Sequence, residues 1–233
     1  MKLAVIPARG GSKRIPRKNI KQFGGRPMIS WSIEATQKTN LFDLIVVSTD
    51  DPEIAEVATT FGAEVPFLRP AGLSDDYTST IPVVAHTVNW YLEREISIDE
   101  VCCIYATAPF IEARDIVTGF DVLLESGADF AFSVTSYAFP VQRALKLGND
   151  GRVEMLDPSQ FETRSQDLCE AYHDAGQFYW GTSTAWLSGK PIFGPHAAPV
   201  ILPRYRVQDI DTIEDWKRAE LMLTSLSSIN SMI

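Results

Sequence analysis

The strongest constraint on the fold is an alternation of short apolar runs with helical segments from residue 2 to about residue 135. "KLAVIPA" (2–8) is a continuous apolar run, typical of a parallel strand buried on both faces. "PMISWSIEATQKT" (27–39) then spaces its apolar residues as a helix does, with Pro27 acceptable in the first turn. Strands alternating with helices in this way predict an α/β protein with a mostly parallel central sheet flanked by helices.

The same pattern predicts the other elements of this half. We expect Asp51 to cap a helix that has Pro52 in its first turn and stops at Gly62. The remaining expected strands are 41–50, 63–68, 100–106 and 129–136, and the remaining expected helices are 51–62, 80–93 and 113–127.

After residue 136 the regular alternation of strands and helices stops. A Gly-Asn-Asp-Gly sequence at 148–151 lies between two apolar runs and predicts a β-hairpin within 141–156. Residues 137–172 therefore read as a small insertion outside the main sheet, and as a possible dimerisation element. Strand character resumes at 176–182 and 204–211, and an amphipathic helix follows at 212–226.

Composition places the chain among ordinary globular proteins. Its 233 residues, 45% of them hydrophobic, suit one domain spanning 1–233. The net charge of −9 argues against nucleic acid as a partner, and no apolar run reaches the length of a membrane span. Three cysteines cannot all pair within one chain, and Cys102 and Cys103 would point to opposite faces of a strand. We expect buried free thiols and a reducing, cytoplasmic location.

Positive charge is concentrated in "ARGGSKRIPRKNIK" (8–21), which holds six of the 21 Lys and Arg residues. The first loop after a strand of an open α/β sheet is a usual ligand site, and glycines there let the backbone approach an oxyanion. The loop fits neither common phosphate-binding glycine motif, so the cluster indicates a triphosphate site of another type; a solvated basic loop is the alternative. The candidate nucleotide-binding residues here are Ala8, Arg9, Gly10, Gly11, Ser12, Lys13, Lys18, Asn19 and Lys21.

An acidic pair lies near the end of the chain. In an extended segment, Asp209 and Asp211 would project from one face, a spacing that suits Mg²⁺ bound through carboxylates and water. The alternative is structural, because Asp211 with Glu214 also fits a helix-capping box.

These motifs resemble a known family. "PARGGSKRIPRKNIK" is similar to the signature of the cytidylyltransferases that activate nonulosonic acids and 3-deoxy-octulosonate. "IVVSTDDPEIA", "RPAGLSDD", "IYATAPF" and "IDTIEDW" follow in that family's order. The resemblance implies a single Rossmann-like nucleotidyltransferase domain. It also implies a reaction of CTP with a sugar acid, giving a CMP-sugar and pyrophosphate.

The resemblance also implies residue roles. Arg9 and Lys18 would contact the phosphates, and Ser12 and Asn19 other parts of the nucleotide. Arg69 and Thr80, from the loop after the third expected strand, would help to hold it. The implied catalytic residues are Lys18, Asp209 and Asp211, of which the two aspartates would bind Mg²⁺.

For the second substrate, "IYATAPF", "FPVQRAL" and "HDAGQFYWG" resemble the branch specific for pseudaminic acid. Sialate enzymes of the family usually carry Gln where this chain has Tyr105, and Gly where it has Arg14. The ring of Tyr105 would suit a deoxygenated, acylated sugar. The implied substrate-binding residues are Tyr105, Arg164, Phe178 and Tyr179, with Arg164 acting across the interface of a homodimer.

Alternatives remain open from the sequence. Phe178 and Tyr179 are strand aromatics, which are more often core residues. His173 and Asp174 could orient or protonate a substrate, but such a pair usually lies on the surface. Legionaminate, N-acetylneuraminate and 3-deoxy-octulosonate are rival sugars, and a nucleotide-sugar-binding regulatory protein without turnover is the rival from another functional class.

Overall fold

A computed structural model describes residues 1–230, except the side chains of the last two, and the end of the expected 1–233 domain lies outside the described residues. Its centre is a six-stranded sheet in the order β10-β6-β9-β5-β1-β4, in which only β9 runs antiparallel to its neighbours. The predicted mostly parallel sheet is therefore confirmed. The strands are β1 (Lys2–Pro7), β4 (Leu44–Ser48), β5 (Glu100–Ile104), β6 (Phe130–Ser136), β9 (Tyr172–Thr182) and β10 (Ala197–Ile201).

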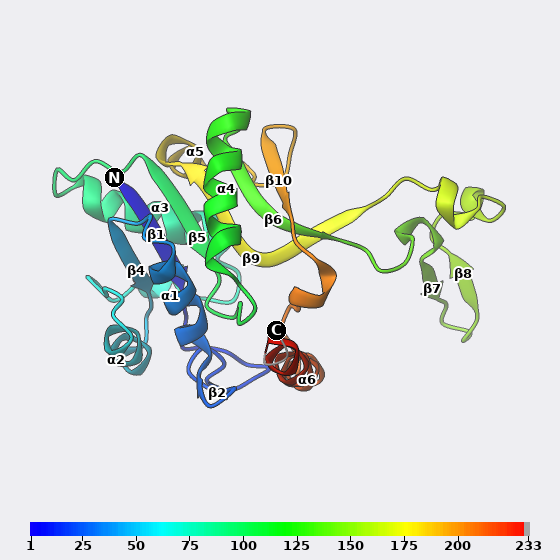
Figure 1. Ribbon diagram of the computed structural model, residues 1–233, viewed down its shortest axis with the longest axis horizontal. Coiled ribbons are helices and arrows are strands. Elements are labelled where there is room, and N and C mark those ends of the chain that lie inside the picture. The colour runs from blue at the N-terminus through cyan, green and yellow to red at the C-terminus, as the bar shows by residue number, and fades with distance from the viewer. Residues whose placement is uncertain (231–233) are drawn as a thin grey trace.

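Helices cover both faces of this sheet (Figure 1). On one face, α1, α2 and α4 pack against Ala4 and Ile6 of β1. On the other face, α3 and α5 pack against Leu3 and Val5. Alternate residues of β1 are thus buried on opposite sides, which is why its sequence is apolar without interruption. The helices are α1 (Met28–Lys38), α2 (Pro52–Thr60), α3 (Thr80–Leu92), α4 (Ala113–Ser126), α5 (Ser183–Ser188) and α6 (Ile213–Asn230).

The described helices include none that is long and apolar enough to cross a membrane. The adjacent Cys102 and Cys103 are free, fully buried and assigned to opposite faces of the sheet, as predicted. Cys169 is also free but exposed, so the expectation of a buried thiol is wrong there. It lies between β6 and β9 in a segment that forms no core of its own.

The predicted strand at 63–68 is absent. Only two isolated bridges join this segment to the sheet region, Val46 to Glu64 and Thr49 to Leu68. Pro66 lies between them and has no N–H to donate, which interrupts a ladder beside the edge strand β4.

The predicted strand at 204–211 is also wrong. Arg204–Arg206 forms a 3₁₀ turn after Pro203, and residues 207–211 have no regular structure. The edge of the sheet is formed instead by β10, which contains Pro199 and pairs in parallel with β6. A proline is tolerated there because an edge strand has one unpaired side.

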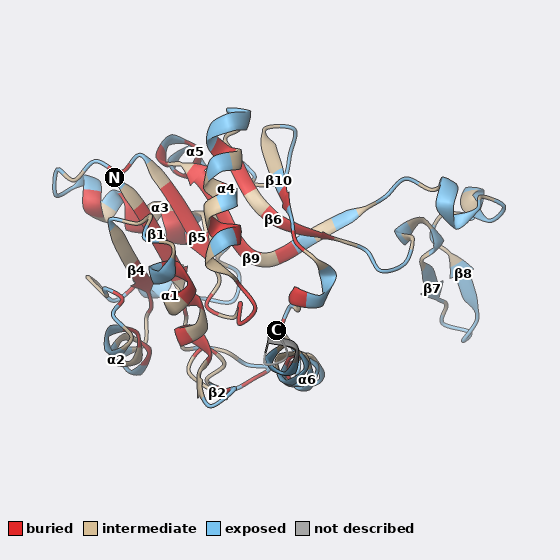
Figure 2. Cartoon of the chain, viewed as in Figure 1, coloured by how far each residue is buried: buried red, intermediate tan, exposed pale blue. Residues whose placement is uncertain are grey.

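Residues 137–171 form an arm that extends away from the sheet between β6 and β9 (Figure 1). It contains the predicted hairpin, made of β7 (Leu145–Leu147) and β8 (Val153–Met155). Gly151 has a φ of 77°, a value that favours glycine in its turn. Figure 2 shows that buried residues fill the sheet, whereas the arm is largely exposed.

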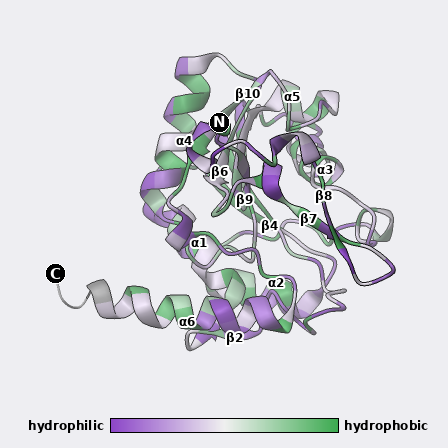
Figure 3. Cartoon of the chain, turned by 90° about the vertical axis from the view of Figure 1, so that its right-hand side faces the viewer, coloured by the Kyte–Doolittle hydropathy of each residue, from purple (hydrophilic) through white to green (hydrophobic). Residues whose placement is uncertain are grey.

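Helix α6 forms a third, smaller core with the first loop. Trp216 on α6 packs edge-to-face on Phe23 with ring centroids 5.4 Å apart, and Phe110 closes the cluster. Phe23 lies in β2 (Gln22–Phe23), which pairs with β3 (Arg26–Pro27) just before α1. Figure 3 shows α6 along the bottom of the molecule beside β2. This packing brings residues 209–211 to the loop that follows β1.

We predict that Gly119→Ala destabilises the protein. Alanine usually stabilises a helix interior by about 1 kcal/mol relative to glycine. A Cβ at Gly119 of α4, however, would lie 2.5 Å from Cε2 of Phe178 and 2.8 Å from Cδ1 of Trp180. Overpacking of this kind typically costs about 1–3 kcal/mol. Urea unfolding measures the loss. Thr118→Ala, at an exposed position of the same helix, is the control, and equal stability of both variants would contradict the prediction.

Candidate active site

A cleft of about 610 Å³ opens where the loop after β1 meets the end of β5 and the start of α3. The carboxyl ends of the five parallel strands share one edge of the sheet, which is where ligands bind in open α/β folds. Many of the residues expected from the sequence line this cleft. They are Arg9, Ser12, Lys13, Lys18, Asn19, Arg69, Thr80, Tyr105 and Asp211.

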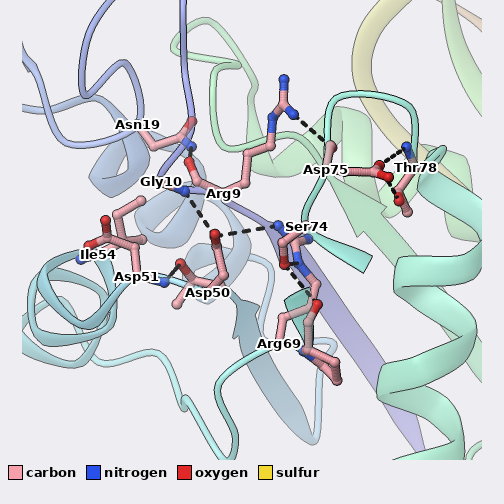
Figure 4. Close-up of polar contacts among 12 residues, drawn as sticks. Arg9, Gly10, Asn19, Asp50, Asp51, Ile54, Arg69, Ser74, Asp75 and Thr78 are labelled. Atoms are coloured by element: carbon pink, nitrogen blue, oxygen red, sulfur yellow. Dashed lines mark hydrogen bonds and ion pairs between the residues drawn. The ribbon is translucent and has the colours of Figure 1, made fainter. Parts of the chain in front are cut away.

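The loop after β1 is held by hydrogen bonds at both ends. Asn19 donates from Nδ2 to the carbonyl of Arg9 over 2.9 Å, and its own carbonyl accepts from the amide of Ile29 in α1. The amide of Gly10 donates to Oδ1 of Asp50 over 2.9 Å (Figure 4). A Cβ at Gly10 would lie 2.5 Å from Oδ2 of Asp51, so this close approach requires glycine.

Cations of the loop face carboxylates on the opposite wall. Arg9 forms a 2.7 Å ion pair with Asp76 and donates to the carbonyl of Asp75, also over 2.7 Å. Lys13 also pairs with Asp76. Hydrogen bonds from Lys13 and Arg9 hold the pKa of the Asp76 carboxyl below its usual value. A bound polyphosphate would compete with Asp76 for the same cations.

Arg69 supplies a buried positive charge. Its side chain is only 3% exposed; Nε donates to Oγ of Ser74 over 3.2 Å, and its guanidinium lies 3.9 Å from the Asp50 carboxylate (Figure 4). Burial lowers its pKa, the nearby Arg9 adds to this effect, and Asp50 opposes it. A charge shielded from water in this way acts more strongly on an anion in the cleft.

Lys18 connects the loop to the segment before α6. Its Nζ donates to the carbonyl of Ile210 over 2.6 Å and lies 3.3 Å from Oδ1 of Asp211. Arg14 reaches the other oxygen of Asp211 at 2.9 Å. The predicted phosphate-contacting lysine and the predicted metal-binding aspartate therefore meet at one point of the cleft.

The neighbouring Arg17 has a different role. Its φ is 55°, and its guanidinium pairs with Asp51 and Glu53 at the start of α2. Asp51 accepts the amides of Glu53 and Ile54, so the predicted helix cap is confirmed. The hydrogen bond from Arg17 lowers the pKa of the Asp51 carboxyl. Arg17 thus belongs to the cap of α2 rather than to the cleft.

The capping alternative for Asp211 is wrong. Helix α6 is capped by Thr212 and Asp215, whose side chains accept each other's backbone amides at 3.2 and 2.8 Å. Because this capping box uses Thr212 and Asp215, the Asp211 carboxylate does not cap the helix and pairs with Lys18 and Arg14 instead.

The acidic pair has the chemistry of a divalent-cation site. Burial and the charge of Asp211 raise the pKa of Asp209, against the opposing effect of Lys18. Two hard oxygen ligands that repel each other suit Mg²⁺, which usually keeps several waters or phosphate oxygens. Among the described residues, no group of three or more His, Cys, Asp or Glu side chains could hold a metal ion.

Some expected nucleotide contacts lie outside the cleft lining. Ala8 is buried in the core and its amide donates to Ser48 of β4 over 2.9 Å. Lys21 places its Nζ 4.6 Å from the ring centroid of Trp216, a cation–π contact with α6. Ala8 therefore connects the loop to β4, and Lys21 connects it to α6.

The expected sugar-binding residues lie in different parts of the structure. Tyr105 lines the cleft. Phe178 does not, because it is fully buried against α4 in the core, so the structure contradicts its expected place in the pocket. Tyr179 is 1% exposed and lies behind Tyr105, with ring centroids 5.1 Å apart. Arg164 lies on the arm, where it pairs with Asp167 at 2.6 Å.

Sequence reasoning missed the acidic wall of the cleft. Asp75 accepts the amides of Tyr77 and Thr78 and so forms a tight turn that presents Asp76. The signal was the Ser-Asp-Asp stretch in the polar loop 69–79, because such residues form local turns.

A sequence model of the cytidylyltransferase family matches residues 3–205. The chain belongs to the cytidylyltransferase family. It is 46% identical over 220 residues to a pseudaminic acid cytidylyltransferase of Campylobacter jejuni, covering 94% of this chain and 95% of that one. It is 30% identical over 228 residues to a CMP-N,N′-diacetyllegionaminic acid synthase of Legionella pneumophila, covering 95% of each.

Solved structures agree on the fold of this cytidylyltransferase. A CMP:2-keto-3-deoxy-manno-octonic acid synthetase complexed with CTP superimposes with a TM-score of 0.68 at 17% identity, covering 96% of this chain and 98% of that one. A 4-diphosphocytidyl-2C-methyl-D-erythritol synthase of Anaerococcus prevotii gives 0.61 at 13% identity, with the same coverage. The predicted Rossmann-like nucleotidyltransferase is confirmed, and membership of an enzyme family counts against a regulatory protein without turnover.

We predict that Lys18→Ala lowers kcat/KM far more than Arg17→Ala does. Lys18 lines the cleft, whereas Arg17 is engaged by the cap of α2. Loss of a charge-assisted phosphate contact typically costs about 1.5–3 kcal/mol, or roughly 10- to 200-fold. Arg17→Ala is expected to lower the melting temperature instead. Steady-state kinetics and thermal melts of both variants check this. Equal kinetic losses would indicate a diffuse basic patch.

Proposed function

We propose that this chain transfers CMP from CTP to the anomeric hydroxyl of pseudaminic acid and releases pyrophosphate. The observation that carries the proposal is the meeting of Lys18 with Asp211 at the carboxyl edge of the sheet. The cation that would bind phosphate and the carboxylate that would bind the metal are therefore adjacent. The relative from Campylobacter jejuni, named for pseudaminic acid, supports this sugar.

In the proposed reaction the anomeric oxygen attacks the α-phosphorus. A bond forms between them while the bond from that phosphorus to the bridging oxygen breaks, pyrophosphate leaves, and the hydroxyl proton passes to solvent. Lys18, Arg9 and the buried Arg69 line the cleft, where they would bind the phosphate oxygens and stabilise their charge. The cleft also positions the two substrates for in-line attack, which removes much of the entropic barrier.

Asp209 and Asp211 would hold Mg²⁺ in this proposal. The ion, when bound, would neutralise charge on the triphosphate and make the α-phosphorus easier to attack. Lys18 then has a second task, because its contact with the Ile210 carbonyl keeps the acidic pair beside the first loop.

Tyr105 is the proposed contact for the sugar. Its hydroxyl lies 3.0 Å from Oγ1 of Thr80, and its ring lines the cleft. A broad ring with one hydroxyl suits a dideoxy, diacetamido sugar better than one whose glycerol tail needs several polar partners.

We also propose that the chain forms a homodimer through the arm. Large apolar side chains are exposed along it, among them Phe139 at 83%, Leu147 at 74% and Phe161 at 70%. A second copy would cover this surface and carry Arg164 to a neighbouring cleft. A cytoplasmic location stays a prediction.

The substrates are tested by a pyrophosphate-release screen of four NTPs against four sugar acids. We expect CTP to exceed ATP, GTP and UTP, and pseudaminate to exceed N-acetylneuraminate, each by roughly a hundredfold in kcat/KM, because unpaired polar groups are rejected on that scale. Legionaminate and 3-deoxy-octulosonate complete the sugar panel. Equal turnover of N-acetylneuraminate would refute the sugar assignment, and equal turnover of UTP the nucleotide assignment.

The metal site is tested by separating Asp211 from Asp215. Asp211→Asn keeps the shape of the side chain but removes a charged ligand, so we expect it to lose most turnover without loss of melting temperature. Asp215→Ala removes the partner of Thr212 in the cap and should cost about 1 kcal/mol of stability while turnover remains. EDTA should abolish wild-type turnover. Full activity of Asp211→Asn would refute the metal assignment.

A further inference from the structure

A buried arginine lies a few residues before the acidic pair and does not line the cleft. Arg206 is 5% exposed. Its Nη1 and Nη2 donate to Oδ2 and Oδ1 of Asp115 over 2.5 and 3.2 Å, and Nη1 lies 3.4 Å from Oε1 of Glu112. Both carboxylates belong to the start of α4. A planar guanidinium that is bound at two points has a fixed direction, so this contact also fixes the chain that carries it.

The backbone of Arg206 is held as well. Its carbonyl accepts from Nε2 of Gln177 over 2.7 Å, and Gln177 is a buried residue of β9. The amide of Tyr105, which lines the cleft, donates to the carbonyl of the same glutamine over 2.9 Å. Arg206 is therefore connected to α4 through its side chain and to β9 through its backbone.

The residues after Arg206 cross from the main core to the smaller core beside α6. Val207 packs against the main core, whereas Ile210 is fully buried in the smaller one with Phe23 and Trp216. Figure 1 shows the orange connection between β10 and α6 that contains this crossing. Residues 207–211 form neither helix nor strand, so the path of the chain is not set by a ladder of backbone hydrogen bonds.

Asp209 therefore depends on the anchors on either side of it. On one side Ile210 is buried, and its carbonyl accepts from Lys18 over 2.6 Å. On the other side Arg206 is three residues away, a reach of at most about 11 Å of extended chain. Asp211 is also paired directly with Lys18, so a shift of Arg206 would move Asp209 first.

Helix α4 does not need the ion pair for its own stability. Carboxylates in the first turn of a helix are stabilised by the helix dipole without a cation. A buried ion pair adds little net stability, because the cost of removing two charges from water offsets their attraction. Its better attested effect is to fix one geometry, and here that is the geometry of the segment leading to the acidic pair.

We propose that Arg206 is a positioning residue for the metal site, which acts with Asp115 to place the Asp209 carboxylate beside Asp211. The inference rests on the proposed function, in which the two aspartates bind Mg²⁺ together with CTP. The charge of Arg206 is balanced by Asp115 and Glu112. It therefore acts through the position of the chain rather than through its electric field.

The test measures CTP binding by calorimetry in EDTA and in Mg²⁺, without a sugar acid. The ratio of the two Kd values reports what the metal site adds to binding, independently of turnover. Arg206→Lys keeps the charge but loses the two-point contact. We expect its Kd for CTP in EDTA to equal that of the wild type. The strengthening by Mg²⁺ should fall about tenfold, the lower end of the range for residues that hold metal ligands.

Arg26→Lys is the matched control. Arg26 also pairs with a carboxylate of a helix, that of Glu34 in α1, but it lies in β3 and does not lead to the acidic pair. Its ratio of Kd values should equal that of the wild type. If Arg206→Lys does not fold, Asp115→Asn takes its place in the same comparison, because asparagine keeps the size of the side chain and one acceptor oxygen.

Coupling to Asp209 separates positioning from a general loss of structure. In an Asp209→Asn background, Arg206→Lys should weaken CTP binding in Mg²⁺ little further, since both changes act on one ligand. Equal losses in EDTA and in Mg²⁺, full additivity with Asp209→Asn, or a ratio unchanged from the wild type would overturn the inference.

Failure of the metal site itself gives a different result. If Mg²⁺ did not strengthen CTP binding to the wild type, or strengthened it equally in Asp209→Asn, the proposed metal site would be refuted, and this inference with it. A metal effect that is lost in Asp209→Asn but kept in Arg206→Lys would refute this inference alone.

Discussion

The contact of Lys18 with Ile210 and Asp211 joins two parts of the chain that are 192 and 193 residues apart. The rest of the site depends on it. Packing of Trp216 on Phe23 brings α6 to the first loop, and the capping box of Thr212 and Asp215 starts the helix after Asp211. The acidic pair therefore lies beside Lys18, and neither of its carboxylates is used to cap α6.

The cations of the cleft offset the repulsion between a negatively charged chain and anionic substrates. The chain carries a net charge of −9, yet both proposed substrates are anions. The cations of the cleft face their own carboxylates, as Arg9 and Lys13 do with Asp76. Such pairs at a solvent-exposed site contribute little to stability, so a polyphosphate with higher charge can replace them. The buried Arg69 keeps a positive charge in the cleft wall throughout.

Local patterns in the sequence predicted much of this. The spacing of apolar residues correctly predicted most strands and helices from β1 to β6, because burial against the sheet requires apolar side chains at regular intervals along each element. The cap at Asp51 and the hairpin within 141–156 were also predictable, since each depends on residues a few positions apart. The strands predicted at 63–68 and 204–211 were wrong. At the edge of a sheet, pairing with distant residues decides whether a segment forms a strand or stays irregular.

By itself, the sequence determined the fold class, the basic loop and the acidic pair, because residue type and short spacing carry that information. Only the tertiary structure decided which members of the loop face the cleft: Lys18 does, whereas Arg17 turns to α2 and Lys21 to Trp216. It alone placed Phe178 in the core and joined Arg206 to Asp115. The physical reason is that side-chain direction at a bulge or loop depends on partners distant in sequence, which no local pattern records.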